Sequence, residues 1–173
     1  MESMKTVWIL SGAPGSGKST WVFENLEPSS AIVSRDRIRF SLLGREDEYF
    51  NCEHEVWRRY VQQAQEALCD DTIKNVYLDA THISETSRNK ILIALNSASI
   101  PDFNIIVVYF DVCFAVCCER NNRREGRARV PEAAIRRMFN SFRAPTFNEK
   151  YKYKEIWRVD AQGNIVKEID DHE

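Results

Sequence analysis

The residues with the clearest chemical meaning form a glycine-rich segment near the N-terminus, Gly12-Ala-Pro-Gly-Ser-Gly-Lys-Ser19. The segment matches the pattern G-x-x-x-x-G-K-S/T and directly follows a short apolar run. Glycines let successive backbone N–H groups point at phosphate oxygens, and a helix that begins here adds its positive dipole end. Lys18 would place its charge at the β- and γ-phosphates, and the Ser19 hydroxyl suits Mg²⁺. The sequence therefore predicts ATP or GTP binding by Gly12, Ala13, Pro14, Gly15, Ser16, Gly17, Lys18, Ser19 and Thr20.

Asp36 and Arg39 form a second pair with chemical potential, just beyond a predicted strand. Their three-residue spacing places both side chains on one face of a helix, at the sheet edge where α/β ligands bind. In a kinase with a hydroxyl acceptor, a carboxylate accepts the hydroxyl proton and an arginine fork grips an acceptor phosphate. The alternative is that Asp36 caps the helix and pairs with Arg37 or Arg39 on the surface.

Asp79 ends another predicted strand and begins the segment Asp79-Ala-Thr-His82. A carboxylate in this place can hold Mg²⁺ through water, so we expect Ser19 and Asp79 to be the metal ligands. Thr81 and His82 are expected on the acceptor side, together with Arg88. The side chains of Thr81 and His82 could equally serve as capping groups at the strand end.

Arginines are concentrated between Glu119 and Arg143, where eight arginines accompany three acids in a chain of net charge −2. A helix that ends in a basic loop containing glycine, followed by a helix that opens on Pro131, is typical of a lid that closes over ATP. We place this lid at about residues 123–130. Its arginines would meet the charge on the transferred phosphoryl group. The alternative is a solvated basic turn.

The elements that must position these groups alternate between apolar runs and segments of helical periodicity. The predicted strands are Lys5–Leu10, Ala31–Ser34, Asn75–Asp79, Asn104–Asp111 and a closing pair at Glu155–Asp160 and Asn164–Ile169. The predicted helices are Lys18–Leu26, Asp36–Leu43, Glu53–Asp70, a region from Ser84 through Leu95, Phe114–Asn122 and Pro131–Phe142. This alternation predicts an α/β fold of P-loop kinase type, a mainly parallel central sheet flanked by helices, in a single domain 1–173.

Two further segments receive plain structural interpretations. Arg45–Glu55 carries five acids against one base and is predicted to be a solvated connection. The five cysteines lack the paired spacing of a metal or disulfide framework. We expect Cys113, Cys117 and Cys118 to serve as small apolar residues on a helix.

Composition limits the classes of function. With 43% hydrophobic and 29% charged residues in 173, the chain should fold as a globular protein. Its net charge of −2 gives no field for coating long nucleic acids, so any such contact must be local. The longest apolar run, Val112–Cys118, has seven residues against the roughly 20 of a membrane helix. The run Val7–Leu10 is too short for the core of a signal peptide, so we expect none. We expect a cytoplasmic protein without a membrane segment.

Several nucleotide-binding classes compete. A GTPase should carry an Asn-Lys-x-Asp segment, whereas the one Asn-Lys pair here, Asn89-Lys90, continues with Ile91-Leu92. A motor ATPase needs a larger chain. A small kinase is therefore the leading class, and a regulatory ATP-binding module without transfer activity remains the alternative from another class.

Taken together, these segments resemble the 5′-hydroxyl polynucleotide kinase family over about residues 5–143. The matching segments are Gly12 to Trp21, Ser34 to Arg39, Asp47 to Tyr49, Phe110 to Val112, and Arg120 through Val130-Pro131 to Met138. The resemblance implies that Lys18 and Ser19 bind the ATP phosphates and Mg²⁺. It also implies that Asp36 is the general base and that Arg39 binds the acceptor nucleotide's 3′-phosphate. The implied lid residues over ATP are Arg120 and Arg124, with Arg124 catalytic.

The chain also departs from the family. His82 stands where the family's motif has Asn, and neither the phosphatase motif Asp-x-Asp-Gly-Thr nor the ligase motif Lys-x-Asp-Gly occurs. The resemblance therefore predicts a stand-alone kinase acting on 5′ ends of DNA or RNA, with other end processing left to a separate phosphatase or ligase. A nucleoside monophosphate kinase or other small-molecule kinase, including a toxin-like kinase of nucleotide sugars, shares much of the same plan and stays the alternative.

Overall fold

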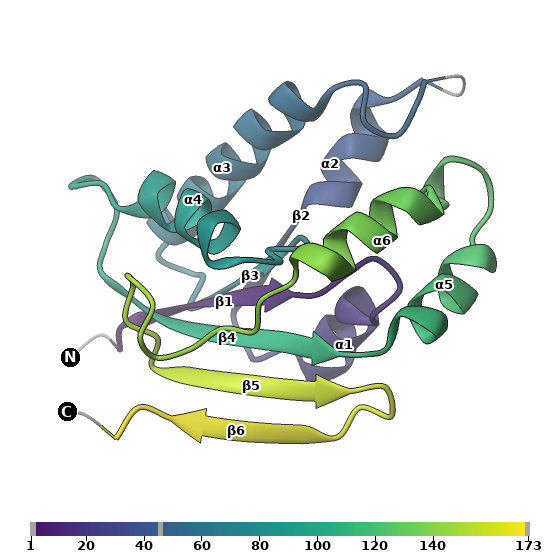
Figure 1. Cartoon of the computed structure of the whole chain (residues 1–173). Helices are drawn as coiled ribbons and strands as arrows, with labels where there is room; N and C mark the ends of the chain where they lie inside the picture. Colours follow the sequence, from purple (N-terminus) through teal and green to yellow (C-terminus); the bar gives the residue numbers. More distant parts are fainter. Residues whose placement is uncertain (1–2, 45–46, 172–173) are drawn as a thin grey trace.

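A six-stranded sheet forms the centre of the computed structural model, which describes residues 3–44 and 47–171 (Figure 1). The strands are β1 (Lys5–Ser11), β2 (Ser30–Ser34), β3 (Asn75–Asp79), β4 (Phe103–Asp111), β5 (Glu155–Asp160) and β6 (Ile165–Ile169). Their spatial order is β2-β3-β1-β4-β5-β6. All pairs are parallel except β5 with β6, which form an antiparallel edge. The predicted α/β fold with a mainly parallel sheet is confirmed.

The helices in the described residues are α1 (Lys18–Asn25), α2 (Arg35–Leu42), α3 (Glu53–Cys69), α4 (Glu85–Leu95), α5 (Phe114–Asn122) and α6 (Glu132–Ser141), with a short 3₁₀ turn at Gly126–Ala128. Of these six α-helices, α2 and α4 begin at a serine whose side chain caps the helix. The hydroxyl of Ser34 accepts from the backbone of Arg37 to cap α2, so Asp36 is not the cap. Ser84 and Ser87 cap α4 reciprocally. Within the described residues, no helix has the length and apolar character needed to cross a bilayer.

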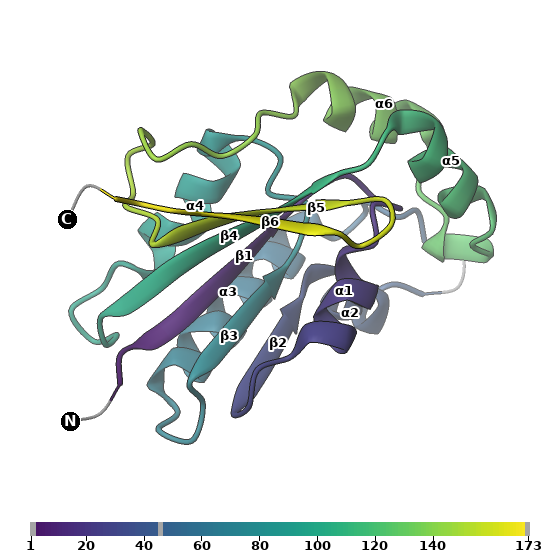
Figure 2. The same ribbon diagram turned by 90° about the horizontal axis from the view of Figure 1, so that it is seen from below.

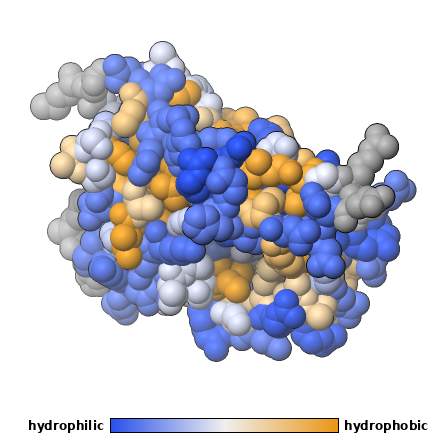
Figure 3. Space-filling view, turned by 90° about the horizontal axis from the view of Figure 1, so that it is seen from above, coloured by the Kyte–Doolittle hydropathy of each residue, from blue (hydrophilic) through white to orange (hydrophobic). Residues whose placement is uncertain are grey.

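Helices cover both faces of the sheet (Figure 2). Alternate residues of β1 show the two layers, because Val7 and Ile9 pack with α3 and α4 while Trp8 and Leu10 pack with α1 and α5. A strand buried on both faces is a near-continuous apolar run, which is why the sequence of β1 lacks polar alternation. The space-filling view from above shows hydrophilic side chains between separate hydrophobic patches (Figure 3).

Two structural interpretations from the sequence need correction. The segment Arg45–Glu55 is not merely a solvated connection: Tyr49 is half-buried and Glu53, the first residue of α3, binds two arginines. Arg45 and Glu46 of this segment lie outside the described residues. Of the three clustered cysteines, Cys117 is buried, whereas Cys113 precedes α5 and is exposed. Exposure at the helix start removes Cys113 from the apolar contacts predicted for it.

Candidate active site

A pocket of about 300 Å³ lies at the carboxyl ends of β1, β2 and β3. The sheet register brings Asp36 and Asp79 into the same pocket. Ser34, the last residue of β2, pairs with Asp79 at the end of β3, and Asp36 follows in the first turn of α2. The lining residues are Pro14, Gly15, Gly17, Lys18, Ser19, Thr20, Ser34, Arg35, Asp36, Arg39, Tyr49, Phe50, Glu53, Asp79, Ala80, Thr81, Arg124 and Met138. The structure thus gathers most of the residues expected for the donor, the metal and the acceptor into one cavity.

The glycine-rich segment between β1 and α1 has the backbone that phosphate binding requires. Gly15 and Gly17 have φ angles of 82° and 93°, which favour glycine. A Cβ on Gly15 would also collide with the carbonyl oxygen of Cys117, so α5 packs directly against the loop. Helix α1 begins at Lys18, and its first N–H groups and dipole therefore face the pocket.

Lys18 and Ser16 show that this loop is suited to an anion. The Lys18 Nζ donates to the carbonyls of Gly12 and Ala13 at 2.9 and 3.0 Å. Burial lowers the pKa of Lys18, while Asp79 and Asp36 raise it. The buried Ser16 hydroxyl has no hydrogen-bond partner among the described residues, which an acceptor-rich phosphate would correct.

The Ser19 hydroxyl donates to Asp79 Oδ2 at 2.7 Å and joins α1 to the end of β3. A hydroxyl and a carboxylate side by side are hard oxygen ligands of the kind Mg²⁺ takes when substrate phosphates and water complete its shell. The described residues contain no cluster of three or more His, Cys, Asp or Glu that could hold a metal alone. The donor set thus fits a nucleotide-bound Mg²⁺ rather than an all-protein metal cage.

Asp36 faces the phosphate loop across the pocket. Its Oδ1 accepts from the Tyr49 hydroxyl at 2.6 Å and also contacts Nη1 of Arg39. Its Oδ2 has no hydrogen-bond partner among the described residues, and the side chain is 48% exposed. Burial raises the pKa of Tyr49, and Asp36 adds to that rise, so the phenol stays a donor. The carboxylate is thereby oriented by one oxygen and open to a ligand at the other.

Glu53 holds the arginines of this wall. It accepts from Nε and Nη2 of Arg39 at 2.7 and 3.0 Å and from Nη2 of Arg35 at 3.0 Å. Nη1 of Arg39 donates to Tyr49 at 2.8 Å and also contacts Asp36, which leaves one N–H on Nη2 without a partner among the described residues. The buried Nε of Arg35 has no partner among the described residues. The free donors of this wall are therefore divided between the two arginines.

The arginine-rich segment after α5 separates into bonded and unbonded side chains. Arg120 donates to the carbonyls of Gly15 and Ala161, and Arg127 donates to Leu43. Arg123 is exposed and pairs with Glu119. Arg124 lines the pocket, and its guanidinium has no hydrogen-bond partner among the described residues. Arg120 braces the phosphate loop without lining the pocket, whereas Arg124 presents an uncommitted charge to it.

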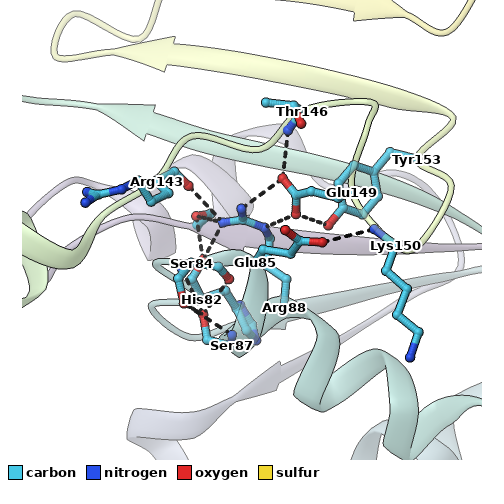
Figure 4. Close-up of polar contacts among 11 residues, drawn as sticks. His82, Ser84, Glu85, Ser87, Arg88, Arg143, Thr146, Glu149, Lys150 and Tyr153 are labelled. Atoms are coloured by element: carbon cyan, nitrogen blue, oxygen red, sulfur yellow. Dashed lines mark hydrogen bonds and ion pairs between the residues drawn. The ribbon is translucent and has the colours of Figure 1, made fainter.

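Two residues expected at the acceptor, His82 and Arg88, are buried and do not line the pocket. His82 bonds Leu10 O at 2.7 Å and the Tyr60 hydroxyl at 3.1 Å. Arg88 has no exposed surface and forms a bidentate pair with Glu149 (Figure 4).

The remaining Arg88 nitrogen, Nη1, donates to the His82 carbonyl at 3.1 Å and to the Arg143 carbonyl at 3.2 Å (Figure 4). The same network reaches the loop, because Ser11 also bonds the His82 carbonyl and Gly12 N–H donates to Thr81 O. His82 and Arg88 therefore fix the turn that carries Thr81, which does line the pocket.

The sequence analysis missed several residues that line the pocket. Arg35, Tyr49, Phe50, Glu53 and Met138 all line the pocket without having been given a role. The available signal was the pair Tyr49-Phe50 within an acidic stretch, since a segment that contacts only solvent would leave two adjacent aromatic rings exposed.

Comparison with known proteins agrees with this geometry. The chain matches the family model described as an AAA domain, AAA_33, over residues 7–145. A chain of the Pnkp1/Rnl/Hen1 RNA repair complex aligns with a TM-score of 0.64 and 24% identity, over 82% of this chain and 45% of its own. The chain thus spans less than half the length of that relative.

Two further structures have the same fold. A fungal RNA kinase aligns with a TM-score of 0.63 and 12% identity, over 98% of this chain and 78% of its own. A sugar kinase from Janibacter sp. HTCC2649 aligns with a TM-score of 0.58 and 15% identity, over 94% and 88%. The chain belongs to the AAA domain family AAA_33 and has the α/β fold of a P-loop kinase.

Proposed function

We propose that this chain transfers the γ-phosphoryl group of ATP to the 5′-hydroxyl end of DNA or RNA. The observation that carries the proposal is the position of Asp36, which lines the same pocket as the phosphate loop and whose Oδ1 is held by Tyr49 and Arg39, while Oδ2 has no hydrogen-bond partner among the described residues. A carboxylate oriented in this way can accept the proton of an acceptor hydroxyl.

Each side of the pocket has its own task in the proposed reaction. The loop N–H groups and Lys18 hold the ATP phosphates, and Arg124 meets the charge that grows on the transferred group. Ser19 and Asp79 would hold Mg²⁺, which neutralises phosphate charge when bound. Asp36 takes the proton as the acceptor oxygen attacks in line, so the hydroxyl need not ionise in water.

The acceptor phosphate is assigned to the neighbouring arginines. Arg35 and Arg39 both line the pocket, and Arg39 keeps one N–H on Nη2 without a partner among the described residues, so a phosphate placed here meets two positive charges and an available donor. A phosphate 3′ to the attacked hydroxyl distinguishes the end of a nucleic acid from a sugar or a bare nucleoside.

The comparisons support a kinase and leave two acceptor classes. Solved structures with this fold include a chain of an RNA repair complex and a fungal RNA kinase. They also include a sugar kinase. The pocket volume of about 300 Å³ is at the small end of the range for ligand sites. Both observations make a small-molecule acceptor the second candidate. A separate phosphatase or ligase acting on the same ends remains part of the proposal, and the similarity to a chain of an RNA repair complex supports a multi-protein setting.

The experiment that tests the proposal is an acceptor screen with γ-labelled ATP. Label should move to a 5′-hydroxyl oligonucleotide, and a 5′-phosphorylated copy of the same oligonucleotide should accept none. Transfer to free sugars or nucleoside monophosphates, with none to the oligonucleotide, would establish the small-molecule reading instead. ATP binding without any acceptor-dependent turnover would point to a regulatory module.

A further inference from the structure

A second cavity lies next to the pocket, and the chemistry described so far does not use it. This groove of about 440 Å³ is lined by Phe50, Ile83, Ala134, Arg137, Met138 and Ser141. Phe50 and Met138 line both the pocket and the groove, so the two spaces are neighbours on either side of these side chains. A ligand that extends beyond the pocket on this side must pass these two side chains.

Phe50 is suited to contact a planar ring. It is 42% exposed, and the Arg39 guanidinium lies 6.0 Å from its ring centroid. Tyr49 packs edge-on against it, with centroids 4.7 Å apart, and thereby holds its orientation. An exposed aromatic face one side chain away from the phosphate-reading arginines is where the next base of a strand would lie.

Arg137 gives the groove a positive charge. It is exposed on α6 and has no ion pair or hydrogen bond among the described residues. Its neighbour Arg136 pairs with Glu132 and stacks on Phe114 at 4.5 Å, and it does not line the groove. The two arginines thus form a matched pair, one free and facing the groove and one already engaged.

We propose that the groove binds the second nucleotide of a single-stranded acceptor, with its base on Phe50 and its 3′-phosphate at Arg137. This inference rests on the proposed function and extends it from the reacting nucleotide to the next one. A base stacks on an aromatic side chain without regard to its identity, and a lone arginine reads phosphate without regard to sequence. The groove therefore selects for strand length rather than for sequence.

Three acceptors separate the contributions: a nucleoside 3′-monophosphate, a dinucleotide with a 3′-phosphate, and the same dinucleotide with an abasic second position. The wild-type chain should use the dinucleotide about 5- to 150-fold more efficiently than the mononucleotide, the range for stacking one base. The abasic acceptor should lose most of this advantage. Equal kcat/KM values for the dinucleotide and mononucleotide would overturn the proposal.

Two variants test the assigned residues. Phe50→Ala should bring the dinucleotide down to the level of the abasic acceptor, and Phe50→Tyr should restore the difference because it keeps the aromatic face. A difference between base-containing and abasic acceptors that survives Phe50→Ala would remove the base from Phe50.

The charge is tested by salt dependence. One phosphate contact contributes about 0.7 to the slope of log kcat/KM against log salt concentration for a single strand. Arg137→Ala should reduce the dinucleotide slope by about that amount, and Arg136→Ala should not. Equal slopes in all three proteins would overturn the Arg137 assignment.

The mononucleotide acceptor distinguishes failure of the proposed function from failure of the groove proposal. If no 5′-hydroxyl acceptor is used at all, the proposed function fails. If the mononucleotide is phosphorylated and the dinucleotide is no better, the groove alone is wrong.

Discussion

The half of the pocket proposed to bind the donor, the donor half, comes mainly from one stretch of chain, residues 12–20, with Asp79 and Arg124 added from elsewhere. The half proposed to bind the acceptor, the acceptor half, is assembled from α2, the turn after it and α3. In the donor half, backbone N–H groups and the start of α1 face the ligand, and the conformation depends on glycines at positive φ. In the acceptor half, side chains hold one another: Tyr49 and Arg39 orient Asp36, and Glu53 orients Arg39.

The difference has a physical consequence. A backbone cradle binds any phosphate chain, so the donor half defines a class of enzyme and not a substrate. A network of side chains places a few charges at fixed positions, and those positions decide which acceptor fits. Substitutions in the donor half should therefore slow transfer to every acceptor, whereas substitutions of the arginines in the acceptor half should discriminate among acceptors.

The largest expected effect is in the donor half. Lys18→Ala should reduce transfer to background for every acceptor, because the loop keeps its backbone and loses the charge that follows the phosphates into the transition state. The measurement is label transfer from γ-labelled ATP, with thermal unfolding to check the fold. Turnover near the wild-type rate would show that the loop is not the donor site.

Asp36→Asn should lower kcat by roughly 10²–10⁴-fold, the usual range for losing a general base, and leave ATP affinity and fold intact. Asp47→Asn is a suitable control, since Asp47 is exposed and bonds the backbone of Gly44 away from the pocket. Unfolding at a markedly lower temperature together with nearly full activity would identify Asp36 as a structural residue.

The same contrast explains what the sequence could predict. The phosphate loop and β3 (Asn75–Asp79) follow from local pattern, because glycine spacing and apolar runs need no distant partner. The role of Glu53 does not, because a carboxylate within an acidic stretch gives no sign of its partner until the fold brings Arg39 against it. Of the two arginines predicted over ATP, Arg124 lines the pocket and Arg120 does not, and the catalytic role of Arg124, like that of Asp36, stays a prediction.

Arg124 provides a second test of the donor half. Arg124→Ala should lower kcat by about 10²-fold with little change in ATP affinity, since it acts on charge that grows during transfer. Arg123→Ala is the matched control, because Arg123 is exposed and bonds only Glu119. The reverse result, a loss with Arg123→Ala and none with Arg124→Ala, would move the catalytic role by one residue.

Arg39 and Arg35 test the acceptor half. A nucleoside 3′-monophosphate should be preferred over the bare nucleoside by about 10- to 150-fold in kcat/KM, the value of a charge-assisted contact of roughly 1.5–3 kcal/mol. Arg35→Ala and Arg39→Ala should each reduce this preference. Arg39→Lys should restore only part of it, because an ammonium cannot reproduce the fork.

These two substitutions differ in their effect on the wall itself. Arg39→Ala also removes the partner of Asp36 and Glu53, so it should lower kcat for the bare nucleoside as well, whereas Arg35→Ala should not touch Asp36. A wild-type protein that treats the nucleoside and its 3′-monophosphate alike would show that neither arginine reads the acceptor.

The smallest expected effect is on stability and concerns His82, which links the strand before the phosphate loop to α3. His82 bonds Leu10 O, at the end of β1 that leads into the phosphate loop, and the Tyr60 hydroxyl on α3. The carbonyl requires a proton on Nδ1, and the neutral ring then accepts from Tyr60 at Nε2. Burial lowers the pKa of His82 to about 3 from an ordinary value near 6.5.

Between these two pKa values the unfolded chain binds more protons than the folded chain, so the free energy of unfolding falls as the pH decreases from about 6.5 toward 3. At one pKa unit per 1.4 kcal/mol, His82 should make the protein about 2 kcal/mol less stable at pH 5 than at pH 8. His82→Asn should be less stable at pH 8, where Tyr60 loses its partner, but should lack this part of the pH dependence. His54→Asn, at an exposed position on α3, should keep it. Urea unfolding of the wild-type protein and the two variants at both pH values makes the comparison. An equal decrease in the free energy of unfolding from pH 8 to pH 5 in all three would show that the neutral His82 ring is not the source of the pH dependence.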